Sequence, residues 1–169
     1  MTTAEEIIEL FNMKSLPQEG GYYVETYRAS ETVPQKLLAE RGCGTRNLNT
    51  AILYLLTPST FSALHRLKSD EIFHFYLGDS VTMVQLRPDA TSDVITLGHD
   101  IINNQHVQAV VPAGTWQGMF LNEGGHFALL GTTMAPGFET EDFELGQREQ
   151  LIAQYPTRRK LIIKLTKSQ

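Results

Sequence analysis

Cysteine is scarce in this chain, whose 169 residues include only one, Cys43. A single cysteine excludes an internal disulfide framework, so the sequence gives no indication of an oxidising compartment. A nucleophilic thiol would need a base beside it, and the sequence around Cys43 offers none. The N-terminus, MTTAEEIIEL, also lacks the basic region that begins a signal peptide. We therefore expect a cytoplasmic protein.

Long apolar runs and positive charge are scarce as well. The longest apolar runs are about six residues, such as 51–56, whereas a membrane-spanning helix needs ~20. The net charge of -5 and the pI near 5.5 argue against nucleic acid or an anionic membrane as the partner. A hydrophobic fraction of 41% with 20% charged residues is typical of a soluble globular protein. The length predicts one domain, residues 1–169.

Most of the chain consists of short segments with the composition of β-strands. Tyr22–Arg28 is rich in aromatic and β-branched residues, and from Asn49 onwards strand-like segments follow one another between turn signals. These later segments are Ala51–Leu56, Phe61–Leu67, Glu71–Leu77, Ser80–Leu86, Asp93–Gly98, His106–Val111, Thr115–Leu121 and His126–Met134. About ten short strands at regular spacing predict an all-β sandwich or closed barrel.

Helices are expected only near the two ends of the chain. Thr3 followed by Glu6 is a capping-box pattern, which predicts a short amphipathic helix that ends before Pro17. Residues 29–48 have weak periodicity and predict a long loop, with a helical turn at 35–40.

The C-terminal part predicts one more helix and one more strand. Gln147–Gln154 has a helical pattern that Pro156 should stop. In Lys160–Thr166, apolar residues alternate with polar ones, which predicts a final strand at a sheet edge.

The segment 61–78, FSALHRLKSDEIFHFYLG, contains the main candidates for chemistry. Side chains alternate between the two faces of a strand. A turn at 68–70 can therefore bring His65 and Glu71 onto the same interior wall. His74 is an odd number of residues from Glu71, so its side chain should leave the site. The spacing predicts a pocket that contains an imidazole and a carboxylate.

Other strands should complete this pocket. In the segment 110–117, VVPAGTWQ, a tight turn precedes a strand on which Gln117 points inward and Trp116 outward, so Gln117 is a candidate ligand-binding residue. Arg28 lies at the end of a strand near the expected barrel mouth, where it could hold an anionic substrate group or form a surface salt bridge. Apolar walls suited to a ring-bearing small molecule are expected from Phe73, Phe75, Met119 and Tyr27.

These segments resemble the two motifs of the cupin superfamily, and the chain resembles the Cupin_5 (DUF985) family in particular. His65, Glu71 and Gly78 match the first His, the Glu and the closing Gly of the first motif, and Pro112 and Gly114 match the second. The stretches PQEGGYYVETYR, RNLNTAILYLL and APGFETEDFELG extend the resemblance over about residues 7–165. The resemblance implies an RmlC-like double-stranded β-helix, a jelly-roll barrel with its pocket at the centre.

The chain departs from the metal-binding members of that superfamily. Leu67 occupies the position of their second His, Gln117 that of their third, and Leu121 that of their final Asn. The remaining candidate metal ligands are His65, Glu71 and Gln117, a weak set for zinc, iron or manganese. The cofactor is left open: the protein uses either none or a divalent metal.

Three functions remain possible at this point. The leading hypothesis is an isomerase- or epimerase-like enzyme that acts on a sugar or similar polar metabolite. In it His65 is the acid or base, Glu71 orients it, and Gln117 donates a hydrogen bond to the substrate. Metal-free sugar-nucleotide epimerases of the same superfamily offer the analogy. The alternatives are a non-catalytic barrel that holds a small ligand and a metal-dependent cupin enzyme. The resemblance also implies a homodimer, because cupin barrels usually pair through sheet edges.

Overall fold

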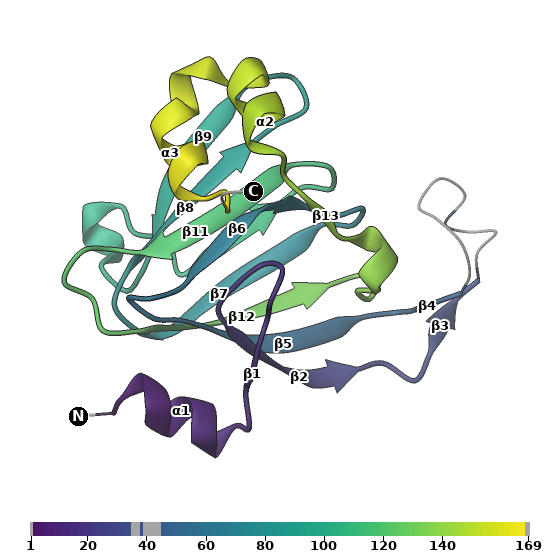
Figure 1. Ribbon diagram of the computed structural model, residues 1–169. Coiled ribbons are helices and arrows are strands. Elements are labelled where there is room, and N and C mark those ends of the chain that lie inside the picture. Colours follow the sequence, from purple (N-terminus) through teal and green to yellow (C-terminus); the bar gives the residue numbers. More distant parts are fainter. Residues whose placement is uncertain (1, 35–37, 39–44, 168–169) are drawn as a thin grey trace.

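Two antiparallel β-sheets packed face to face form the body of the protein (Figure 1). The computed structural model describes residues 2–34, 38 and 45–167. The larger sheet has the order β1 (Lys14–Ser15), β2 (Tyr22–Arg28), β5 (Thr50–Leu56), β12 (Ala128–Met134), β7 (Glu71–Gly78) and β10 (Gln108–Val111). The smaller sheet has the order β13 (Glu144–Leu145), β6 (Phe61–Arg66), β11 (Trp116–Leu121), β8 (Val81–Leu86) and β9 (Ser92–Leu97). The all-β architecture predicted from the strand spacing is confirmed.

The space between the sheets is filled mainly by apolar side chains, because each strand turns alternate residues inward. On β7, Glu71, Phe73 and Phe75 are buried, while Ile72 and His74 between them are partly exposed. The interior cluster consists of Tyr54, Leu56, Phe73, Phe75, Val81, Met83, Leu97, Ala109, Val111, Met119, Ala128 and Leu130.

Short helices cover the outer faces of both sheets (Figure 1). The capping box begins α1 (Ala4–Leu10): the Thr3 side chain accepts a hydrogen bond from the Glu6 amide, and the Glu6 carboxylate accepts one from the Thr3 amide. Ala4 and Ile7 of α1 pack in a cluster with Leu55 and Leu129 of the larger sheet. Among the described residues there are also three short 3₁₀ segments: η2 (Ile101–Asn103), η3 (Thr140–Asp142) and η4 (Pro156–Arg158).

The predicted final strand at Lys160–Thr166 is wrong, because this segment contains helix α3 (Arg159–Lys164). Together with α2 (Arg148–Gln154), it covers the outer face of the smaller sheet. Ile162 and Leu165 are fully buried in a cluster with Trp116, whereas Ile163 is 42% exposed. The apolar residues of so short a segment fit both the two-residue repeat of a strand and the 3.6-residue repeat of a helix. Packing against the sheet selects the helix.

The predicted long loop at 29–48 is also partly corrected. Two short strands, β3 (Thr32–Val33) and β4 (Arg46–Asn47), pair within it. The helical turn predicted at 35–40, like Cys43, falls almost wholly outside the described residues. Across the described residues, the helices are all too short or too polar to span a bilayer.

Candidate functional site

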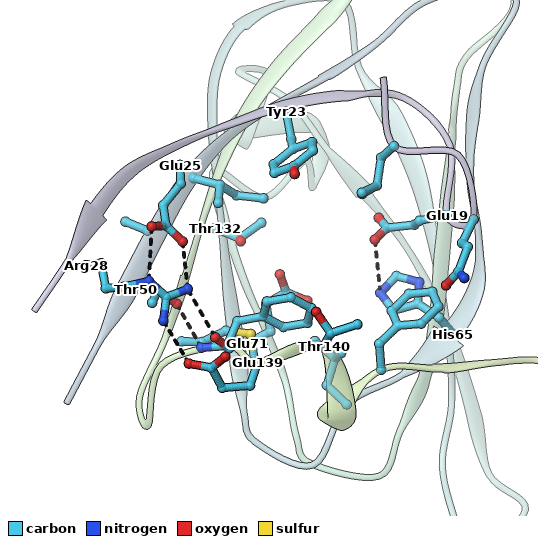
Figure 2. Close-up of a pocket in the computed structure, with 18 residues that line it drawn as sticks. Glu19, Tyr23, Glu25, Arg28, Thr50, His65, Glu71, Thr132, Glu139 and Thr140 are labelled. Carbon is cyan, nitrogen blue, oxygen red and sulfur yellow. Dashed lines mark hydrogen bonds and ion pairs between the residues drawn. The ribbon is translucent and has the colours of Figure 1, made fainter. Parts of the chain in front are cut away.

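A cavity of about 350 Å³ opens between the two sheets at one end of the barrel. Its walls come from strands β2, β5, β6, β7 and β12 and from two irregular segments, 16–19 and 138–143. Figure 2 shows how these segments surround it, with His65 and Glu19 on one side and Arg28, Glu25 and Glu139 on the other. The irregular segments therefore add polar groups, Glu19 and Glu139 among them, to those that the strands contribute.

His65 lies on β6 with its side chain almost fully buried, and one backbone contact fixes its tautomer. Nδ1 lies 2.8 Å from the carbonyl oxygen of Ala63. Because a carbonyl can only accept, Nδ1 carries the proton, and in the neutral ring the lone pair is on Nε2. Phe143 stacks on the imidazole with ring centroids 5.1 Å apart. The side chain thus presents a basic nitrogen in a fixed orientation.

Gln117 lies opposite His65 in the register of β6 and β11 and links it to Glu71. Its amide nitrogen donates a 2.6 Å hydrogen bond to Glu71 Oε2 and lies 3.3 Å from His65 Nε2. Its amide oxygen is buried and has no hydrogen-bond partner among the described residues. Such an oxygen costs about 1–3 kcal/mol of stability, so the amide holds this orientation at some expense.

Glu71 begins β7 and is buried at the base of the cavity. Burial raises the pKa of its carboxyl above the ordinary value of 4.5, against the opposing effects of the His65 charge and of hydrogen bonds from Thr132 and Gln117. The sequence predicted that Glu71 orients His65. In the structure the Ala63 carbonyl does so, and Gln117 stands between the two side chains.

Glu19 is a site residue that the sequence analysis missed. Its Oε2 lies 3.8 Å from His65 Nε2, and its Oε1 accepts a 2.8 Å hydrogen bond from Ser62. Two glycines follow it with positive φ, 106° at Gly20 and 73° at Gly21. A Cβ on Gly20 would lie 2.2 Å from the backbone oxygen of Phe61. The adjacent glycines were the available signal, because they let this segment press against β6.

Arg28 lies on the opposite side of the cavity and is held by the protein itself. Its guanidinium donates to both carboxylate oxygens of Glu25, to Glu139, to the Asn47 side chain and to the Phe138 carbonyl. These are five hydrogen bonds, and a guanidinium has five N–H groups. The arginine therefore ties β2 to the segment that follows β12.

Comparisons with known proteins agree with this architecture. The model of the Cupin_5 family, described as Cupin superfamily (DUF985), matches residues 5–146. The chain belongs to this cupin family. An uncharacterised protein of Saccharomyces cerevisiae is 32% identical over 133 residues, which cover 74% of this chain and 66% of the yeast protein, slightly less than two thirds of its length.

Solved structures place the fold among the cupins. A crystal structure of a protein from Shewanella oneidensis superposes with a TM-score of 0.88 at 30% identity and full coverage of both chains. Oxalate decarboxylase from Bacillus subtilis superposes with a TM-score of 0.55 at 17% identity over 94% of this chain and 38% of its own, a likeness of fold alone. The jelly-roll prediction and the family resemblance are confirmed, and the protein is a small-molecule-binding cupin.

The side chains at this cupin site do not fit a metal centre. Leu67, in place of a second His, lines the cavity, and Gln117 turns its amide nitrogen rather than its oxygen toward Glu71 and His65. Among the described residues, no group of three or more His, Cys, Asp and Glu side chains is arranged to hold a metal ion. An amide nitrogen donates hydrogen bonds and does not coordinate a metal ion, so Gln117 in this orientation is not a metal ligand.

The structure divides the remaining predicted site residues between the cavity and its surroundings. Arg28 lines the cavity together with His65 and Glu71. Phe73, Phe75 and Met119 point inward as predicted, but they belong to the interior cluster and are not among the residues that line the cavity. Tyr27 is 53% exposed and is not among them either. His74 contacts Thr133 and Gln108 on the outer side of β7.

Proposed function

We propose that this cupin is an enzyme that moves a proton within a small, sugar-like hydroxy-carbonyl compound. One observation carries the proposal. The Nε2 atom of His65, left basic by the Ala63 contact, lies at a cavity wall beside Glu19 and is linked through Gln117 to Glu71. A fixed imidazole among carboxylates, in a pocket large enough for a small metabolite, is a typical arrangement for acid/base catalysis.

His65 acts as the base in the first step. Its Nε2 removes the proton from the carbon next to the substrate carbonyl, and the C–H electron pair forms the C=C bond of an enediol. Glu71 supplies a proton to the carbonyl oxygen, because burial raises the pKa of its carboxyl and so favours the protonated form. The site then holds an imidazolium, a Glu71 carboxylate and a neutral enediol.

The second step returns both protons. The hydroxyl on the original C–H carbon gives its proton to Glu71 and becomes the new carbonyl. The imidazolium delivers its proton to the neighbouring carbon, so the carbonyl has moved by one position and both side chains are restored. Glu19, with Oε2 at 3.8 Å from Nε2, stabilises the imidazolium between the steps.

Hydrogen exchange tests this proposal before the substrate is identified. Trioses to hexoses are incubated with the protein in D₂O, and ¹H NMR follows loss of the C–H signal next to the carbonyl. We expect at least one compound to exchange faster than in buffer, and His65→Asn to slow that exchange about 100-fold or more. His126→Asn is the control, because that side chain is 87% exposed and lies apart from the cavity lining.

A second candidate is a barrel that binds its ligand without transforming it. Leu67 at the cavity wall, where metal-binding cupins have a His, favours this reading because it removes a catalytic group of the superfamily. A ligand recovered unchanged after long incubation, with no exchange in D₂O, would favour the binding barrel over the isomerase.

The metal-dependent alternative has its own test. Elemental analysis of protein purified without chelator should find less than stoichiometric transition metal. Stoichiometric metal that disappears in His65→Ala would replace the metal-free mechanism. We also propose a homodimer formed through sheet edges, and a monomeric sedimentation profile would contradict that.

A further inference from the structure

We infer that the cavity selects molecules that carry a protonated primary amine and discriminates against anionic ones. This inference rests on the site of the proposed function and names the class of compound that enters it. It comes from the charges that line the cavity, from the hydrogen bonds that occupy Arg28 and from the position of Glu19 Oε2.

The lining carries more acidic than basic groups. Three carboxylates, those of Glu19, Glu25 and Glu139, face the cavity among its described lining residues, against one guanidinium, that of Arg28. Glu71 also lines the cavity, but its burial favours the protonated form. His65 adds a positive charge only when both of its ring nitrogens carry a proton, and even then the carboxylates outnumber the cationic groups. A concave site of one sign concentrates ligands of the opposite sign, because the surrounding protein screens the charges less than water does.

The arginine cannot reverse this preference. Arg28 makes five hydrogen bonds, to Glu25, Glu139, Asn47 and the Phe138 carbonyl. A guanidinium has five N–H groups, so the number of bonds equals the number of donors. An anionic ligand would have to break one of these bonds and would then face the carboxylates that Arg28 now neutralises. The arginine shapes the wall and does not serve as an anion receptor.

On the His65 side, the geometry leaves room for an ammonium group. Oε1 of Glu19 accepts from Ser62, but Oε2 lies 3.8 Å from His65 Nε2, which is too long for a hydrogen bond. An ammonium group has three donors, and Glu19 Oε2 is an acceptor within its reach, whereas His65 Nε2 already faces the Gln117 amide nitrogen at 3.3 Å. Nearby, the buried Gln117 oxygen also lacks a partner among the described residues. The His65 side of the cavity therefore has more hydrogen-bond acceptors than donors.

Three probes of nearly equal size but different charge test the inference. Ethanolamine, ethylene glycol and glycolate carry charges of about +1, 0 and −1 at neutral pH. Each is titrated at pH 7 while NMR follows the ring C–H signals of His65, up to about 100 mM so that even millimolar binding fills the site. We expect ethanolamine to bind at least tenfold more tightly than ethylene glycol, and glycolate to bind most weakly.

Two variants connect the preference to the site. Glu19→Gln keeps the shape of the side chain but removes its charge, so the ratio of ethanolamine to ethylene glycol affinity should fall at least fivefold. Glu144→Gln is the matched control, because Glu144 pairs with Arg66 away from the cavity lining and its loss should leave the ratio unchanged. An unchanged ratio in Glu19→Gln overturns the inference.

The remaining outcomes separate this inference from the proposed reaction. Equal or tighter binding of glycolate, or no response to any probe, overturns the amine preference even if hydrogen exchange is observed. A cation preference without any exchange supports the inference and refutes the isomerase. In His65→Asn, exchange should be lost while the order of the three affinities is kept, measured by the signals of Phe143.

Discussion

The two ends of the barrel interior are built by the same strands yet have opposite character. At the open end, β7 contributes Glu71 and β11 contributes Gln117 to the polar site. Two residues further along the same strands, Phe73 and Met119 belong to the packed apolar cluster. We call the part of the interior that this cluster fills the closed end. One step of the strand repeat thus separates a group that can exchange protons from one that only packs.

The difference shows that one end of the interior contributes mainly to stability and the other contains the groups able to do chemistry. Side chains at the closed end contact other apolar groups from both sheets, so their burial is favourable without further arrangement. At the open end, Glu71 and the Gln117 oxygen are buried at a cost, and irregular segments rather than strands supply part of the wall. Substitutions at the two ends should therefore differ in kind as well as in size.

The largest expected effect is at the closed end. Phe73→Ala removes a ring that is 2% exposed and leaves a cavity, so it should lower the free energy of unfolding by about 3–5 kcal/mol, measured by urea denaturation. Tyr27→Ala, at a 53% exposed side chain, is the control and should change it by less than about 1 kcal/mol. Similar losses in the two variants would mean that the closed end is loosely packed.

Much of this comparison could be predicted from the sequence, because strand alternation decides which side chains point inward. His65, Glu71 and Gln117 were found in this way, and the structure brings them together. Alternation gives the face of a residue but not its depth along the barrel. Phe73 and Met119 were therefore predicted as pocket walls, although they lie in the cluster beyond the pocket.

What the sequence could not give depends on contacts between distant segments. Glu19 lies on an irregular segment and reaches the site through Ser62 and through its own carbonyl, which accepts from the Ala63 amide at 2.8 Å. Helix α3 was mistaken for a strand because only its packing on the smaller sheet selects between the two periods. In both places tertiary contacts decide the local structure.

A substitution at the open end should have an intermediate effect on stability but a large one on function. Gly20→Ala forces a Cβ to within 2.2 Å of the Phe61 carbonyl and strains a residue with φ of 106°, so we expect a loss of about 2 kcal/mol. Hydrogen exchange and ethanolamine binding should fall as well, because the segment that carries Glu19 must move away from β6.

Gly124→Ala isolates the backbone part of that effect. Its φ of 80° is also positive, but a Cβ there would meet nothing within 4 Å. It should cost less than Gly20→Ala and leave exchange and binding unchanged. If the two variants lose equal stability and both keep ethanolamine binding, the position of Glu19 does not depend on its glycine neighbours.

The smallest expected effect on stability comes from Glu71 at the open end. It depends on pH because it arises from the ionisation of this one carboxyl group. The pKa of Glu71 is raised in the folded state, so its contribution to stability is full below 4.5, its ordinary value, and is lost as the pH rises through the folded pKa. Glu71→Gln cannot ionise, and its amide oxygen can still accept from Gln117. The variant should therefore gain stability relative to the parent between pH 4 and 8, by on the order of 1 kcal/mol in urea denaturation. If the unfolding free energies of the variant and the parent change in parallel with pH, burying the Glu71 carboxylate does not destabilise the fold. If the difference between them grows as the pH rises, the charged carboxylate at the open end is what lowers stability.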